Sequence, residues 1–192
     1  MNNYNDSDTE SVVSSHDSYD SDTESVLSDT ESFVNETSNN ELITISGEQI
    51  NINCQSLELS DNELTEIPEE IKNLNNLKIL ILNGNIIKEI KNLPQQIEYL
   101  ILNNNKITEI KNIPQGIKEL NLSNNKIIEI KNLPQGLEKL NLNGNIIKEI
   151  KNLPNSLRIL ELNDNKIREI NNINCLEKLY INGTNILNEF TG

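Results

Sequence analysis

One glutamate recurs at a regular spacing along most of the chain, and a stack of carboxylates is a candidate cation site. These residues are Glu66, Glu89, Glu109, Glu129, Glu149 and Glu169. Calcium takes several oxygen ligands and would suit such a column. A lysine follows four of the glutamates by two residues, on the same side of an extended backbone. The lysines are Lys91, Lys111, Lys131 and Lys151. We therefore favour a solvent-exposed column of salt bridges over a cation site, and expect neither a metal nor another cofactor.

The residues that most often perform catalysis are scarce and scattered. The only histidine, His16, has no partner nearby in the sequence, and Cys54 and Cys175 have no His or Cys neighbours at metal-ligand spacing. Neither a Gly-rich phosphate loop nor a Ser-His-Asp or Cys-His set is present in the sequence. We therefore expect that the protein is not an enzyme.

Residues 1–40 differ sharply in composition from the rest of the chain. They contain ten acidic side chains and no Lys or Arg, so they contribute −10 to the net charge of −14 and leave −4 for residues 41–192. The motif SDTES recurs at 7–11, 21–25 and 28–32. A segment with this charge and so few apolar residues cannot offset its ordering entropy by burial, which predicts a disordered tail.

Three serines in this tail are candidate phosphorylation sites. Ser7, Ser21 and Ser28 each precede an aspartate and have a glutamate three positions later. This pattern resembles the acceptor site of acidophilic, casein-kinase-2-like kinases. Phosphates there would provide ligands for Arg clusters. The alternative is a tail that only solvates the protein and opposes aggregation, and we favour that alternative.

The charge balance also bears on partners and location. An acidic chain repels nucleic acid and anionic lipid, and we find no basic patch in the sequence that would reverse this. The N-terminus does not resemble a signal peptide, and no apolar segment is long enough to span a bilayer. We expect a monomer in the cytoplasm that binds neither nucleic acid nor membrane.

From residue 77 onward the chain repeats itself. The segments LKILILNGNIIKEIKNLPQQ, IEYLILNNNKITEIKNIPQG, IKELNLSNNKIIEIKNLPQG, LEKLNLNGNIIKEIKNLPNS and LRILELNDNKIREINNIN follow one another, and CLEKLYINGTNIL comes next. Their first apolar positions are residues 77, 97, 117, 137, 157 and 176. An earlier copy at 54–76 is twenty-three residues long. Such a period indicates a solenoid, in which each coil contacts only its neighbours.

The frame L-x-x-L-x-L-x-x-N-x-L-x-x-I in these segments resembles the leucine-rich repeat. In one copy the matching residues are Leu77, Leu80, Leu82, Asn85, Ile87 and Ile90. The twenty-residue length with LP near its end is similar to the short repeats of bacterial effector proteins, while the first copy resembles a longer class of intracellular signalling proteins. The resemblance covers about residues 54–187. If the chain is an effector, its location would be the cytoplasm of a host cell.

The resemblance implies an α/β-type solenoid: a right-handed superhelix with a parallel, concave sheet. Leu80 and Leu82 alternate on a strand and would point to one side, toward a core shared by stacked coils. We expect a strand, a turn at Gly47-Glu48 and a strand over 41–53 as a cap, about six or seven repeats over 54–187, and a C-terminal end at 188–192. The end NILNEFTG would be a weak cap.

Two further expectations concern the interior and the convex side. The recurrent Asn at 62, 85, 105, 125, 145 and 165 should turn inward and satisfy backbone groups of its own coil and of the next. Thr184 stands at that position in the last copy. The segment NGNIIKEIKNLP, at 83–94 and again at 143–154, has helical apolar spacing, but its length and its proline predict an extended or short 3-10 return. Cys54 and Cys175 should lie at or beside the first core position.

Leucine-rich-repeat proteins bind partners through the side chains between the core leucines of the concave sheet. In this register those positions hold Ile79, Ile81, Tyr99, Ile101, Glu119, Asn121, Lys139, Asn141, Ile159, Glu161 and Tyr180. The first four should form an exposed apolar patch, Tyr180 with Ile159 a weaker one, and the middle four a polar region. Isoleucine also suits any strand, and AT-rich codon usage would supply it, so both explanations of the patch remain open.

Together these features predict a non-catalytic scaffold that binds a protein partner through its concave face. The alternative is a regulatory subunit or pathogen effector in which the acidic, phosphorylatable tail is the active element and the solenoid only localises it.

Overall fold

The computed structural model describes residues 41–170 and 173–183. Several expectations lie outside these residues: the tail at 1–40 with Ser7, Ser21, Ser28 and His16, the position of Thr184, and the end at 185–192, which includes the predicted C-terminal end at 188–192.

The described chain begins with an antiparallel hairpin of β1 (Leu42–Ile45) and β2 (Glu48–Asn51). Its turn is Ser46-Gly47, one residue earlier than the expected Gly47-Glu48, and both turn residues have positive φ, as a two-residue hairpin of this kind requires. Ile45 is fully buried and Ile43, Ile50 and Ile52 pack against the core. The hairpin therefore covers apolar side chains at this end of the solenoid.

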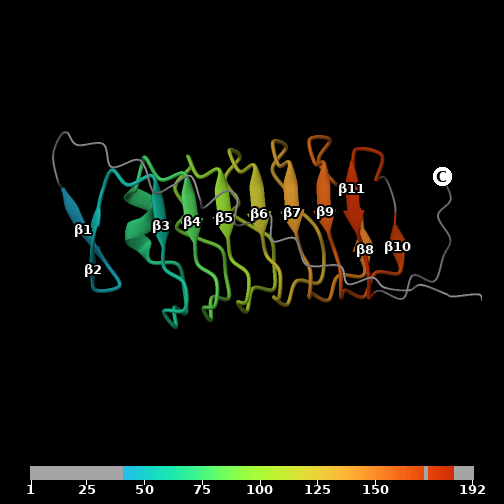
Figure 1. The fold of residues 1–192 in the computed structure, drawn as a ribbon, viewed down its shortest axis with the longest axis horizontal. Helices are drawn as coiled ribbons and strands as arrows, with labels where there is room; N and C mark the ends of the chain where they lie inside the picture. The colour runs from blue at the N-terminus through green and yellow to red at the C-terminus, as the bar shows by residue number, and fades with distance from the viewer. Residues whose placement is uncertain (1–40, 171–172, 184–192) are drawn as a thin grey trace, which may run out of the picture. The chain divides into compact units, whose positions relative to one another are not determined.

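Seven short parallel strands follow, and they form one sheet in the order in which the chain makes them (Figure 1). They are β3 (Ser56–Glu58), β4 (Ile79–Ile81), β5 (Tyr99–Ile101), β6 (Glu119–Asn121), β7 (Lys139–Asn141), β9 (Ile159–Glu161) and β11 (Lys178–Tyr180). Each strand pairs with the strand of the adjacent coil, so the order of strands in the sheet follows the order of coils in the chain.

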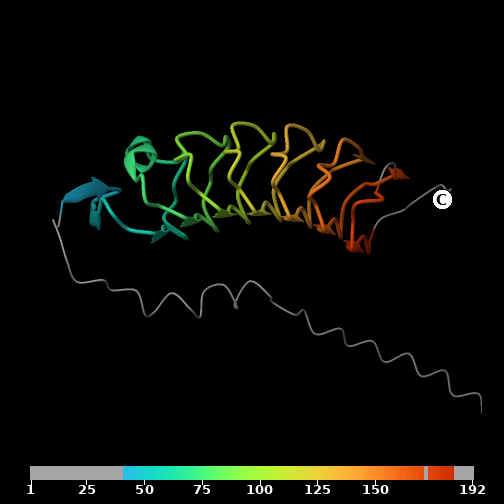
Figure 2. The same ribbon diagram turned by 90° about the horizontal axis from the view of Figure 1, so that it is seen from above.

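The segments that connect the strands return on the opposite side, which we call the return side (Figure 2). In the described residues the only helical turn there is the 3-10 helix η2 (Glu69–Asn73), in the longer first repeat. Two short strands, β8 (Glu149–Ile150) and β10 (Glu169–Ile170), pair in parallel. The prediction that NGNIIKEIKNLP is extended rather than helical is confirmed in both copies.

The core lies between the sheet and the return side and continues from coil to coil. In the coil that starts at Leu77, the side chains of Leu80, Leu82, Ile87 and Ile90 are completely buried. The same positions are buried in the following coils, through Ile167. Full burial of one such side chain stabilises the fold by about 1.5–3 kcal/mol, and no coil can bury them without its neighbours. The solenoid fold expected from the repeat frame is confirmed.

Candidate functional site

The outward face of the sheet, which we call the sheet face, carries two columns of side chains. One column is formed by the first residue of each strand and the other by the third. The structure aligns all the predicted positions in register. One column contains Ser56, Ile79, Tyr99, Glu119, Lys139, Ile159 and Lys178, and the other contains Glu58, Ile81, Ile101, Asn121, Asn141, Glu161 and Tyr180. Adjacent strands lie about 4.8 Å apart, so neighbours in a column are close enough to act together.

The apolar end of this face is smaller than the sequence predicted. Ile79 lies beside Tyr99 and Ile81 beside Ile101. Ile79, Tyr99 and Ile101 are partly exposed, but Ile81 is only 4% exposed, so the expectation of four exposed apolar groups is wrong at Ile81. Ile81 lies level with two long side chains, Glu58 and Ile101, whereas Ile101 has the shorter Asn121 on one side.

The middle of the face is polar, and part of it is already hydrogen-bonded. Glu161 accepts bonds from the side-chain amides of Asn141 and Asn143, both at 2.9 Å. Asn121 accepts bonds from the backbone N–H and the hydroxyl of Ser123, at 3.0 and 2.9 Å. These contacts hold the amide groups in fixed positions. A ligand would thus meet an ordered set of donors and acceptors.

Tyr180 is 42% exposed at the C-terminal end of the described sheet. The sequence had grouped it with Ile159. In the structure Glu161 lies directly opposite Tyr180, and Lys178 lies opposite Ile159, so the two apolar residues are diagonal neighbours. This second cluster is therefore mixed in character.

A column of alternating charge borders the sheet face, one residue before each strand, and the sequence analysis missed it. The carboxylate of Glu98 lies 2.9 Å from Nζ of Lys78 and 2.5 Å from Nζ of Lys118. The bonds from Lys118 and then Lys78 lower the pKa of Glu98, and the bond to Glu98 raises the pKa of Lys118. In the sequence, the signal for this column was that Lys and Glu alternate at the residue before each strand from one repeat to the next.

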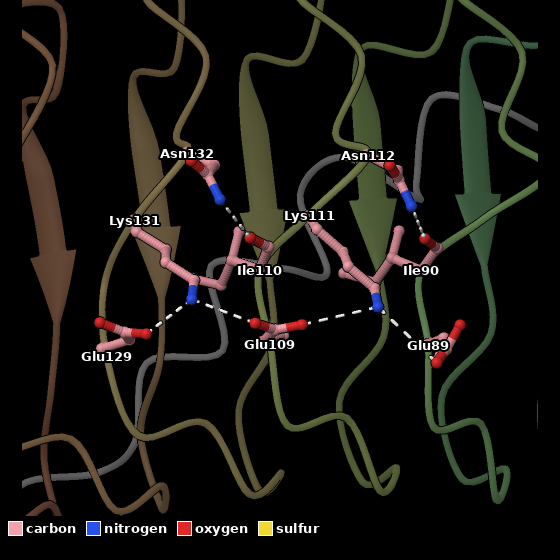
Figure 3. Close-up of polar contacts among 9 residues, drawn as sticks. All are labelled: Glu89, Ile90, Glu109, Ile110, Lys111, Asn112, Glu129, Lys131 and Asn132. Carbon is pink, nitrogen blue, oxygen red and sulfur yellow. Dashed lines mark hydrogen bonds and ion pairs between the residues drawn. The ribbon is translucent and has the colours of Figure 1, made fainter.

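Five of the six recurrent glutamates form the expected salt bridges on the return side (Figure 3), and Glu169 forms none within the described residues. Nζ of Lys131 lies 3.1 Å from Glu109 and 2.6 Å from Glu129, and Lys111 bridges Glu89 and Glu109 at 3.6 and 3.5 Å. Lys131 is the main cause of a lowered pKa at Glu109. Lysines therefore form ion pairs with these carboxylates. The described residues contain no group of three or more His, Cys, Asp or Glu side chains that could hold a metal ion.

The buried asparagines tie each coil to the coil before it. The side-chain amide of Asn125 donates to the carbonyls of Leu102 and Leu122, at 2.9 and 3.1 Å, and its oxygen accepts the N–H of Ile107. Asn85, Asn105, Asn145 and Asn165 make equivalent bonds. The predicted inward role is confirmed for these five, but they serve the preceding coil rather than the next one.

Asn62 is an exception and corrects the prediction. It is exposed, and its side-chain amide donates to the carbonyl of Ser60 in its own coil. It belongs to the first repeat, so no repeat precedes it to offer a carbonyl at the end of a strand.

A second set of asparagines lies on the return side, and the sequence analysis did not predict its role. Asn92, Asn112, Asn132 and Asn152 have φ between 55° and 58°, a left-handed conformation that Asn tolerates better than most residues. Asn112 and Asn132 also donate to the carbonyls of Ile90 and Ile110 in the preceding coils (Figure 3). The available signal was the recurrence of Asn directly after the column lysines.

Both cysteines are free and partly buried. Cys54 packs against the core, and burial raises the pKa of its thiol, which disfavours the reactive thiolate. Cys175 directly precedes Leu176, where the last described coil begins.

Comparisons with known proteins agree with this architecture. A Leucine Rich Repeat family model matches residues 53–74 and a FNIP Repeat family model matches residues 104–145. No curated protein matches the chain. In the described residues, no helix is long and apolar enough to cross a membrane.

Several solved structures have a similar fold. YopM, a leucine-rich effector protein from Yersinia pestis, is 29% identical with a TM-score of 0.64, over 70% of this chain and 38% of that one. YopM from Yersinia enterocolitica is 28% identical with a TM-score of 0.55, over 58% and 25%. An internalin from Listeria monocytogenes, at 21% identity and a TM-score of 0.59, covers 74% and 53% and shows the fold alone. The chain thus spans between about a quarter and about half of the length of these proteins, and its expected resemblance to leucine-rich repeats of the bacterial-effector type is confirmed.

Proposed function

We propose that this leucine-rich-repeat solenoid is a non-catalytic scaffold that binds a protein partner through the sheet face. The observation that carries the proposal is the register of the sheet, which gathers Ile79, Tyr99 and Ile101 next to a polar region of Glu119, Asn121, Lys139 and Asn141. Leucine-rich-repeat solenoids are generally interaction scaffolds, so the fold also favours this function by analogy.

The chemistry of the face suits a protein surface. Partly exposed apolar groups beside an ordered polar region resemble the mixed core and rim of protein interfaces. Tyrosine is enriched among the residues that dominate binding energy, and Tyr99 lies between Ile79 and Glu119, where the apolar end meets the polar region. We therefore expect Tyr99 to anchor the partner and the amides of the polar region to set its orientation.

Affinity purification with surface variants tests the proposal. The double variant Tyr99→Asp with Ile101→Asp places charge on the sheet face without touching the fully buried core. Ile81 is unsuitable because it is buried, and its replacement would confuse loss of binding with loss of folding. Leu42→Asp is the matched control, since Leu42 is 53% exposed on β1, which is not part of the seven-stranded sheet.

Proteins that bind the wild type and Leu42→Asp but not the double variant are the expected partners. If every bound protein stays bound to the double variant while its circular dichroism is unchanged, the sheet face is not the binding site.

The three SDTES copies favour a second candidate function, in which the acidic tail is the active element. The triple variant Ser7→Ala, Ser21→Ala and Ser28→Ala separates the two ideas. Loss of partners in this variant, with no loss in the double variant of the sheet face, would favour the tail.

A further inference from the structure

A row of exposed cations lies outside the sheet face, along the segments that lead from each strand toward the return side. It contains Lys88, Lys106, Lys126, Lys148, Lys166 and Arg168, and we call it the exit strip. In each coil the residues of the strip alternate with buried isoleucines, such as Ile107 and Ile127. The backbone N–H of Lys106 donates to Ile87 at 2.9 Å, and that of Lys126 to Ile107 at 2.8 Å. These bonds stack the coils here, so the cations lie on one continuous surface.

The charges of the exit strip are not neutralised within the described residues. None of its six cations forms a salt bridge there, whereas eight of the other ten Lys and Arg side chains do. The glutamates that follow the strip in sequence, such as Glu109 and Glu149, are bound instead by Lys131 and Lys151. The strip therefore keeps its positive charge although the protein is acidic as a whole.

Two isoleucines are exposed within this row of cations. Ile128 is 53% exposed and lies two residues after Lys126; Ile146 is 43% exposed and lies two residues before Lys148. They are two of the four large hydrophobic side chains that are most exposed in the described chain. Covering them would add apolar contact to the electrostatic attraction of the strip.

The sequence predicted no basic patch, and the exit strip is not visible as a run of basic residues. Five of the six cations are separated by eighteen to twenty-two residues, so no basic run appears in the sequence, and only the stacking of coils brings them together.

We propose that the exit strip is a second binding surface, which takes an acidic polypeptide segment whose carboxylates are interspersed with apolar side chains. Carboxylates would pair with the free cations, and apolar side chains would cover Ile128 and Ile146. Duplex nucleic acid fits less well, because its phosphate backbone offers nothing apolar to these isoleucines, and the net charge of −14 repels a long polyanion. The proposal is independent of the sheet face, so either surface can fail its test without the other.

Fluorescence anisotropy with the full chain tests this proposal. The probe is a labelled synthetic peptide in which pairs of acidic residues alternate with Leu and Phe. We expect saturable binding that weakens as salt rises. The variant Lys126→Glu with Lys148→Glu should weaken binding by about tenfold or more, because it reverses two charges that face the peptide. The matched control is Lys72→Glu with Lys178→Glu, which reverses two other exposed lysines outside the strip and should change binding by less than about threefold.

A second pair of variants isolates the apolar contribution. Ile128→Ser should weaken binding by about fivefold, while Leu42→Ser, an equally exposed position on β1, should leave it unchanged. A peptide with the same charges but Ser in place of Leu and Phe should bind more weakly than the probe.

Several results would overturn the proposal. One is no binding by the wild type, and another is an equal loss in the strip variant and the lysine control, which would indicate a general charge effect. Equal affinity for the Ser-substituted peptide would remove the role of Ile128 and Ile146. Tighter binding of a DNA duplex or of phosphatidylserine vesicles, lost in the strip variant, would assign the strip to nucleic acid or to a membrane surface instead.

Discussion

The return side and the sheet face are built by the same coils, yet their side chains repeat to different degrees. On the return side, Glu109, Lys111 and Asn112 are followed one coil later by the same three residue types. On the sheet face, Tyr99 is followed by Glu119 and then by Lys139. Return-side residues contact the adjacent coil through salt bridges and backbone bonds, so each coil needs the same residue. The architecture leaves the sheet face free to vary, and recognition can use that freedom.

The largest effect on the free energy of unfolding is expected when an asparagine that links two coils is removed. Asn125→Ala leaves the N–H of Ile107 without its partner in the interior and removes one of two amide bonds to the carbonyls of Leu102 and Leu122, which Asn105 and Asn145 still bond. The expected cost is about 2–3 kcal/mol. Glu119→Ala, on the sheet face, should change the free energy of unfolding by less than about 0.5 kcal/mol. Urea denaturation followed by circular dichroism measures both. Similar losses in the two variants would contradict the division between positions that hold coils together and positions that do not.

A smaller effect is expected at the turn that leaves each strand. Gly144 has a φ of 65°, and a Cβ there would lie 2.2 Å from the Oδ1 of Asn124, so Gly144→Ala should destabilise the protein by about 1–2 kcal/mol. Gly136 is the matched control. A Cβ at Gly136 would make only an ordinary contact at 3.6 Å, with the carbonyl of Gln115, and Gly136→Ala should be neutral or slightly stabilising. Equal thermal melting temperatures for the two variants would show that this turn does not require its left-handed conformation.

Much of the fold was predictable because its signals repeat. The period predicted the register of the strands. The recurrent Asn predicted the buried hydrogen bonds between coils, and the recurrent Glu predicted the salt bridges of the return side. What could not be predicted depends on neighbouring coils. Ile81 is buried between the long side chains of Glu58 and Ile101, and Asn62 is exposed because no repeat precedes it. The exit strip assembles cations that are about one repeat apart in sequence. The left-handed Asn92 and its equivalents required a backbone conformation that composition alone does not reveal.

The smallest effect should come from the exposed salt bridges of the return side. Lys131→Ala should lower the denaturation midpoint only slightly at low salt, and the difference from wild type should vanish at high salt, because exposed pairs are screened. A difference that persists at high salt would show that Lys131 acts through packing rather than charge.

The pH dependence of these bridges follows from the direction of each pKa shift. Lys131 lowers the pKa of Glu109 below its ordinary value of 4.5 in the folded protein. The stability that this pair contributes is therefore present above pH 4.5 and is lost as the pH falls through the lower, folded value. At the basic end, the pKa of Lys131 is raised above 10.5, chiefly by Glu129, so its contribution is lost as the pH rises through the higher value. Denaturation midpoints of wild type and Lys131→Ala should converge at both extremes, and a constant difference across pH would contradict the pairing.

The central claim is that a protein partner lies against the sheet face, and site-specific photo-crosslinking tests it most directly. A photoreactive benzoylphenylalanine in place of Tyr99 keeps an aromatic ring at the apolar end of the sheet face, and the same group at Leu42 serves as the control. We predict a discrete crosslinked protein from position 99 that is absent from position 42. Crosslinks of equal yield and identity from both positions, or none from position 99 while a partner still co-purifies, would contradict the account.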